Sequence, residues 1–167
     1  MATRLSKCLL LVSVALLYTL IVFNNTTDYN TNYQFVRHVL QMDTILPGNH
    51  VMWRAIHSPA IHTVSYLFII LWEAVTAVLC WWGSLRMLRA LRATAADFGH
   101  AKQLGIAALT LGMLMWFGAF IVIGGEWFLM WQSHLWNGQG VAFNNFAILG
   151  IVLLYVSLQD ADAATTR

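Results

Sequence analysis

Hydrophobic residues are concentrated in four long stretches that contain almost no charge, and polar segments separate them. The stretches cover residues 8–23, 59–85, 104–131 and 143–158. A helix needs roughly 20 apolar residues to cross the ~30 Å of hydrocarbon in a bilayer, so the first and last stretches must extend into their polar flanks. Lipid offers the backbone no hydrogen-bond partner, which favours α-helices throughout. The pattern predicts an all-α integral membrane protein, a four-helix bundle with a single domain over residues 1–167.

A shorter helical pattern lies between the first two stretches. Apolar residues recur in helical register in the segment YQFVRHVLQMDTILPG, and the pair Pro47-Gly48 closes it. This spacing predicts a short amphipathic helix that lies on the membrane surface in the first outer loop.

Composition and charge define the environment and the orientation. Hydrophobic residues make up 59% of the chain and charged residues only 10%, far from the balance of a soluble domain. Most basic residues precede the first stretch, lie between the second and third, or end the chain: Arg4, Lys7, Arg86, Arg89, Arg92, Lys102 and Arg167. Only Arg37 and Arg54 lie in the other two loops. Because basic loops stay in the cytoplasm, we expect both termini to be cytoplasmic.

The lipid bilayer is the first partner that the sequence predicts. We expect Arg86, Arg89 and Arg92 to anchor the inner end to anionic headgroups, and Trp127 and Trp131 to lie among the outer headgroups. The net charge of +2 follows from this topology, and no glycine-rich phosphate loop follows a strand. Nucleic acid is therefore not an expected partner.

The second stretch carries a polar stripe. Its helix should start at Pro59, with Ser58 as the cap. From there polar residues recur at helical spacing on one face: His62, Tyr66, Glu73 and Thr76. The third stretch instead carries small residues that let another helix approach closely: Gly105, Ala108, Gly112, Gly118, Gly124 and Gly125. We expect these two stretches to form the central helix pair.

Two carboxylates interrupt the apolar stretches. Glu73 lies ~21 Å from the outer end of the second stretch, and Glu126 lies ~8 Å from the outer end of the third. A carboxylate at such depth costs a few kcal/mol unless it is paired, hydrogen-bonded or protonated. We expect Gly124 and Gly125 to bring the third stretch close to the second, so that Glu126 turns inward. Glu126 would then be the hub of an intramembrane polar cluster: Glu126, His62, Tyr66, Glu73 and Thr76. In the simpler alternative, both glutamates only lock helices together by hydrogen bonds.

Histidines gather at the outer side of the predicted bundle. His57, His62 and His134, together with Asp43, form a candidate site for zinc or copper. The spacing is not specific, because His57 and His62 are five residues apart and no HExxH motif occurs. Ordinary loop histidines are the better interpretation. We predict no cofactor, with zinc, copper or a quinone as the alternative.

Several segments resemble a known family. They are, in chain order, FVRHVLQMDT, WRAIHSPAIH, IILWEA and GGEWFLMWQSHLWNGQ. These segments resemble the predicted small integral membrane proteins of bacteria that form domain of unknown function twenty-one sixty-five. The resemblance covers most of the chain and implies a bacterial inner membrane and four spans. It brings no catalytic residues with it.

Two functions of different classes fit these features. The first is a non-enzymatic structural or accessory component of the inner membrane, which forms a homo-oligomer or docks to a larger membrane complex. The alternative is a transport or redox module, in which the intramembrane glutamates, His62 and Tyr66 conduct protons or a cation, or hold a metal or a quinone. A cavity lined by these side chains would favour the alternative, and a dry, fully bonded network would favour the first.

Overall fold

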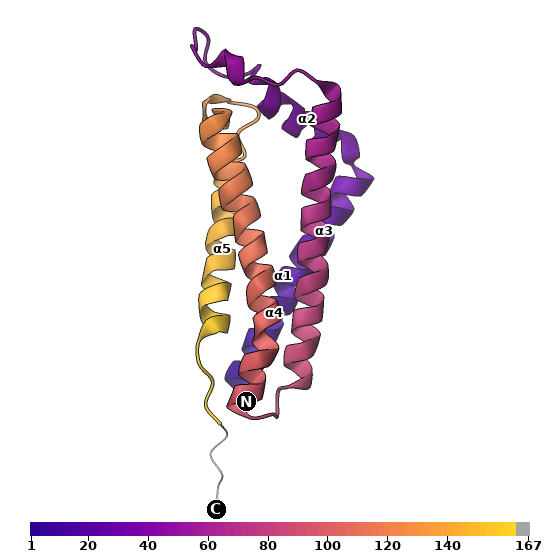
Figure 1. Ribbon diagram of the computed structural model, residues 1–167, viewed down its shortest axis with the longest axis vertical. Coiled ribbons are helices and arrows are strands. Elements are labelled where there is room, and N and C mark those ends of the chain that lie inside the picture. Colours follow the sequence, from indigo (N-terminus) through magenta and orange to yellow (C-terminus); the bar gives the residue numbers. More distant parts are fainter. Residues whose placement is uncertain (163–167) are drawn as a thin grey trace, which may run out of the picture.

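The computed structural model describes residues 1–162, which form helices and their connections without any strand (Figure 1). The long helices are α1 (Ala2–Thr27), α3 (Pro59–Arg89), α4 (Ala95–Met113), which continues directly into η2 (Leu114–Trp127), and α5 (Gln139–Ser157). The short ones are α2 (Tyr29–Gln41), η1 (Met52–Arg54) and η3 (Met130–Gln132). Within residues 1–162, α1, α3, the joined α4–η2 and α5 are long and apolar enough to cross a membrane. The predicted all-α, four-span fold is confirmed.

Local sequence explains where these helices begin. Helix α3 starts at Pro59 as predicted, because a proline in the first turn loses no intrahelical hydrogen bond. Ser58 does not cap it with its hydroxyl, and instead its carbonyl oxygen accepts the His62 amide at 3.1 Å. Helix α4 has the side-chain cap that α3 lacks, since Thr94 Oγ1 accepts the Asp97 amide at 3.1 Å.

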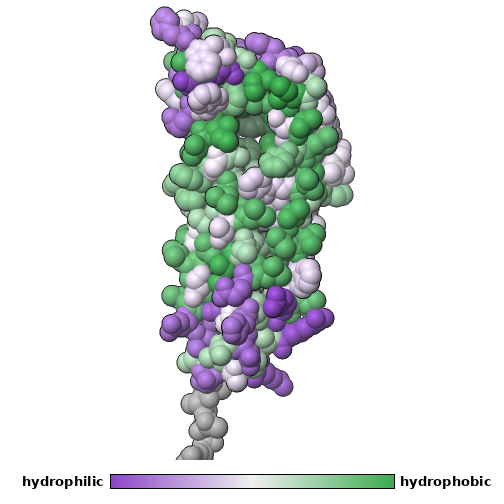
Figure 2. Space-filling model, in the orientation of Figure 1, coloured by the Kyte–Doolittle hydropathy of each residue, from purple (hydrophilic) through white to green (hydrophobic). Residues whose placement is uncertain are grey.

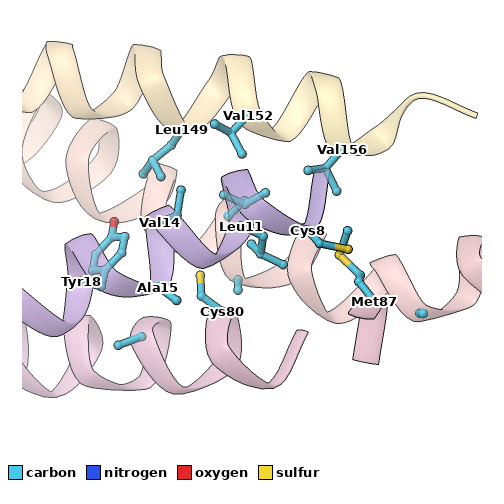
Figure 3. Packing of buried hydrophobic residues seen from close by; sticks show 14 of the residues in the cluster. Cys8, Leu11, Val14, Ala15, Tyr18, Cys80, Met87, Leu149, Val152 and Val156 are labelled. Carbon is cyan, nitrogen blue, oxygen red and sulfur yellow. The ribbon is translucent and has the colours of Figure 1, made fainter. Parts of the chain in front are cut away.

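The inner half of the bundle is closely packed. Small and aliphatic side chains of α1, α3 and α5 interdigitate there, including Cys8, Ala15, Cys80 and Leu149 (Figure 3). Helices α3 and α4 approach closely at Gly83, where an added Cβ would lie 2.8 Å from the backbone nitrogen of Gly105. This contact brings the second and third spans together, as predicted.

Gly105, one of the glycines selected from the sequence, makes that contact, but the others do not. Gly112 faces α1, where a Cβ would lie 2.5 Å from the Tyr18 hydroxyl. A Cβ added at Gly118 would meet nothing within 4 Å, Gly124 faces Met130, and Gly125 is packed against the Gln139 side chain. The expectation that Gly124 and Gly125 draw η2 toward α3 was therefore wrong.

The outer half of the bundle opens. Helix α3 packs on α1 and α4, whereas η2 packs mainly on α5, so α3 and η2 diverge toward the outer end (Figure 1). Helix α2 spans the opening, because the Phe35 ring stacks on Phe120 of η2 at 6.2 Å and His38 stacks on Trp136 at 4.8 Å. The segment η2 is itself a π-helix, a rare geometry that recurs at functional sites. Its last bond joins the Phe128 amide to the Ile123 carbonyl oxygen, five residues earlier, at 3.0 Å.

Polar residues cover both ends of the molecule, with an apolar belt between them (Figure 2). Six of the seven basic residues assigned to the cytoplasmic side belong to the end formed by the start of α1, the α3–α4 turn and the segment after α5 (Figure 1). The seventh, Arg167, lies outside the described residues. Arg86, Arg89 and Arg92 are exposed at this end. Trp127 and Trp131 are half exposed toward the other end.

Buried ion pairs hold this basic end together. Lys7 and Lys102 both donate to Asp160, at 3.0 and 2.7 Å, and both also donate to the Leu158 carbonyl oxygen. Arg4 donates to the carbonyl oxygens of Ala93 at 2.6 Å and Ala161 at 3.1 Å. The segment after α5 is thereby fixed to α1 and α4.

Candidate functional site

A hydrogen-bonded chain of three residues connects α1 to α3 where the bundle opens. The Glu73 side chain is buried, with an exposed fraction of 2%, and its Oε2 accepts a hydrogen bond from Asn25 Nδ2 at 2.6 Å. The Tyr66 hydroxyl donates to the Asn25 carbonyl oxygen at 3.0 Å. Asn25 belongs to the last turn of α1, which ends at Thr27. One asparagine thus ties both polar positions of α3 to the neighbouring span.

These three residues line a cavity of about 320 Å³. Its other walls come from η2 and α2, with Trp116 and Phe120 on one side and Phe35 above. Trp116 is 6% exposed and forms part of this wall, and its indole Nε1 is buried next to the Tyr18 hydroxyl. The polar group that the cavity offers is therefore the Glu73 carboxylate, which accepts one hydrogen bond from the described residues.

A second hollow, of about 370 Å³, adjoins this cavity. Four residues line both spaces: Phe35, Val36, Ile69 and Phe120. The remaining walls of the second hollow come from α2, α3, η2 and the turn after it, and apart from Ser65 the side chains that the structure places there are apolar or glycine. We call this hollow the apolar groove and the first one the polar cavity. Together they form a space that is polar at one end and apolar at the other.

The structure brings together only part of the polar cluster expected from the sequence. Glu73 and Tyr66 meet through Asn25. His62 is buried, but its Nε2 pairs with the Ile56 carbonyl oxygen at 2.8 Å and so fixes the preceding loop. Thr76 donates to the Trp72 carbonyl oxygen of its own helix at 2.9 Å.

Glu126 does not reach this cluster. Its side chain is exposed beside Val122 and Trp127, and it makes no hydrogen bond or ion pair with residues 1–162. The physical reason is the divergence of η2 from α3, which leaves the outer turn of η2 facing away from the polar stripe. The expected hub at Glu126 was therefore wrong.

The outer histidines are also dispersed. His57 and His134 are exposed, and Asp43 pairs with His38 at 2.8 Å. In the described part of the chain, no three histidine, cysteine, aspartate or glutamate side chains are placed to share one metal ion. The structure thus does not assemble the candidate zinc or copper set.

Sequence reasoning missed two residues that line the cavity. Asn25 lies in the polar run NNTT just beyond the first apolar stretch, but it continues a seven-residue spacing from Leu11 and Tyr18, both buried on the same face of α1. Trp116 lies one helical turn beyond Gly112, on the buried side of the third span. Following the buried face of each helix along the sequence toward the outer end of the span would have identified both residues.

Comparison with known proteins identifies a family. The family model described as "predicted small integral membrane protein (DUF2165)" matches residues 3–159. No curated protein and no solved structure matches the chain.

Proposed function

The chain belongs to the family of predicted small integral membrane proteins, and we propose that it is a non-enzymatic component that binds a small amphiphilic molecule in the polar cavity. One observation carries the proposal. The Glu73 carboxylate is buried, accepts one hydrogen bond from the described residues, and lines a space of about 320 Å³ whose other walls are largely apolar. Sites for small molecules typically have volumes of ~300–1,000 Å³ and a few polar groups set in apolar walls.

A purely structural role explains Glu73 less well. A carboxylate that only locks helices together would be saturated by neighbouring donors, since burying charge without partners is costly. Here Asn25 supplies one hydrogen bond, and the rest of the carboxylate borders the cavity. A ligand hydroxyl supplies the missing donor, because its O–H can donate to the Glu73 carboxylate.

Binding is also better supported than conduction or catalysis. A conducting chain needs contact between its members, but Glu126 is exposed and His62 bonds to a backbone carbonyl. Among the described residues that line the polar cavity there is one carboxylate and no histidine, cysteine or serine. The usual pairing of a nucleophile with a base is therefore not found in this lining.

The proposal includes a location in the cell. The resemblance to bacterial inner-membrane proteins and the clustering of basic residues at one end support an inner-membrane protein with both termini in the cytoplasm. In this orientation, the polar cavity and the apolar groove lie in the outer half of the molecule.

A fluorinated phenol tests the proposal. Its hydroxyl both donates and accepts, and binding of 4-fluorophenol to the protein in lipid nanodiscs can be followed by fluorine NMR against empty nanodiscs. Glu73→Leu removes the acceptor, so we expect ~2- to 10-fold weaker binding, the value of one hydrogen bond. Glu126→Leu is the matched control, because Glu126 is exposed and lines neither hollow. Equal affinities for the wild type and Glu73→Leu would falsify the proposal.

Self-association, or docking to a membrane complex, is the second candidate function. Gly118 in η2 and Gly140 in α5 have no neighbour within 4 Å, so both spans present a small residue at which another helix can approach. Native mass spectrometry in mild detergent tests this role. A monomer with no copurified protein would contradict it.

A further inference from the structure

We propose that the molecule bound in the polar cavity is a lipid-soluble compound with an uncharged hydroxyl head and a single long apolar chain, and that it enters sideways from the bilayer between α3 and η2. This inference rests on the proposed function and names the class of ligand for the same site. Its basis is the pairing of the polar cavity with the apolar groove.

The groove is suited to a hydrocarbon chain. It has a volume of about 370 Å³, and Ser65 is the one polar side chain among the described residues of its lining. A head group would find almost no partners there, whereas methylene groups would contact side chains such as Val39, Phe68 and Phe128. The groove therefore accommodates the apolar part of a ligand.

The mouth of the groove faces lipid. Val64 and Phe68 on α3 are 67% and 55% exposed, and Ile123 on η2 is 52% exposed. These side chains belong to membrane-spanning helices, so what surrounds them is hydrocarbon. Figure 2 shows the hollow on this side, surrounded by hydrophobic residues near the outer end. The hydrocarbon chain of a ligand can pass from the bilayer into the groove without crossing water.

The groove leads directly to the polar groups. Phe35, Val36, Ile69 and Phe120 line both spaces, so a molecule whose chain lies in the groove has its head beside Glu73 and Trp116. Asn24 and Asn32, near the α1–α2 junction, border the polar cavity on the far side. Helix α2 covers the space from above through its ring contacts with η2 and Trp136 (Figure 1).

Charge decides the kind of head group. Within residues 1–162, no lysine or arginine lines either the polar cavity or the groove. A phosphate or a free carboxylate would therefore lack a counter-charge and would be repelled by an ionised Glu73. An ammonium head could pair with Glu73, but it has no lone pair to accept from the side-chain amides of Asn24 and Asn32, which line the same cavity. An alcohol or phenol can donate to Glu73 and accept from an amide.

Other occupants fit less well. A transmembrane helix with its side chains is ~10–12 Å across, too wide for a groove that α2 closes on one side. A phospholipid brings two chains and an anionic phosphate. The single-chain alcohol or phenol is the class that matches both volume and charge.

Photo-crosslinking in nanodiscs tests this inference. The probe is 4-dodecylphenol with a diazirine in the middle of its chain, and peptide mass spectrometry locates the labelled residues. We expect labelling within residues 64–69 and 119–128, the segments of α3 and of the third span that contribute side chains to the groove. The same chain with a phosphate head is the decoy, and it should label the exposed faces of all spans without preference for the groove.

Two variants separate the groove from the polar cavity. Ala119→Trp fills the groove at a position that does not line the polar cavity. It should reduce groove labelling to the level of the decoy and leave the binding of 4-fluorophenol unchanged, which also shows that the variant is folded. Ala107→Trp is the matched control, because Ala107 is exposed on α4 and lines neither hollow. It should behave like the wild type in both assays.

The possible results are distinct. If 4-fluorophenol binds but the phenol probe labels the groove no more than the decoy does, the hydrocarbon chain of the ligand does not lie in the groove. This inference then fails, while the proposed function still stands. Groove labelling by the phosphate decoy at the level of the phenol would overturn the choice of an uncharged head. If 4-fluorophenol itself does not bind, the proposed function fails first.

Discussion

Asp160→Asn should destabilise the protein strongly, because two buried ammonium groups depend on this one carboxylate. The side chains of Lys7 and Asp160 are 0% and 3% exposed, and Lys102 is nearly as well buried. Solvent therefore screens these pairs little. Removing one partner of a buried ion pair typically costs ~3–5 kcal/mol, since the remaining charge is left without compensation. Here the variant leaves two cations side by side, with only the Leu158 carbonyl oxygen in common.

The stability that Asp160→Asn removes has an upper limit. The segment that carries Asp160 follows α5, so it can detach locally before the bundle unfolds, and the observed loss then equals the cost of detachment. Thermal denaturation in detergent, followed by tryptophan fluorescence, measures global stability. Limited proteolysis after Leu158 measures detachment. We expect a lower melting temperature, faster cleavage, or both.

Asp162→Asn provides the matched control. Asp162 is 70% exposed and lies 3.9 Å from Arg4, a surface pair worth ~0–1 kcal/mol. Adding Lys7→Met to Asp160→Asn should recover part of the loss, because it removes one of the two uncompensated charges. The reasoning is refuted if Asp160→Asn and Asp162→Asn melt alike and are cleaved alike.

Three further predictions concern pH, packing and orientation. Burial alone would raise the pKa of Asp160, but hydrogen bonds and charge from the two lysines outweigh this effect and hold the pKa below its usual value. The ionised carboxylate therefore stabilises the fold above pH ~3.9, and this stabilisation should be lost as the pH falls further. Melting curves of the wild type should show the loss, and those of Asp160→Asn should not. Gly83→Ala should cost ~1–3 kcal/mol in denaturation, because its Cβ would meet α4 backbone at 2.8 Å, whereas Gly118→Ala meets nothing within 4 Å and should be neutral. Asn30→Cys should react with an impermeant thiol reagent from outside the cell, and Ala96→Cys should not. The two native cysteines are buried, so they should add little background labelling. The reverse result would overturn the orientation.

The four spans could be predicted from the sequence because length and hydropathy alone define them. Lipid requires each long apolar stretch to be a helix, whatever its neighbours are. The start of α3 and the existence of α2 depend on equally local signals, a proline in the first turn and a run of apolar residues in helical register. The exact ends were less predictable, since α1 reaches Thr27 through a run of asparagines and threonines. Those polar residues remain helical because Asn25 pairs with α3.

The candidate site could be predicted only in part, because it depends on how far apart two helices lie. The spacing on α3 correctly indicated that Glu73 and Tyr66 share a buried face. It could not indicate the partner, because Asn25 reaches Glu73 through the crossing of α1 and α3, 48 residues apart in the chain. Glu126 was misplaced for the same reason. Glycines in a span permit close packing, but they do not say which neighbour uses them.

The opening between α3 and η2 follows from where the glycines are used. Gly83 and Gly105 hold α3 and α4 together at the inner end, while Gly125 packs against Gln139 at the start of α5 and so holds η2 to the other side. One continuous span is thus drawn toward α3 at its base and toward α5 at its top. The two ends of that span cannot both lie against α3, so a space must open above the inner core. Glu73 lies on α3 just above that core, one turn beyond the buried Thr76, so a carboxylate stands on the wall of a cavity that helix packing itself creates.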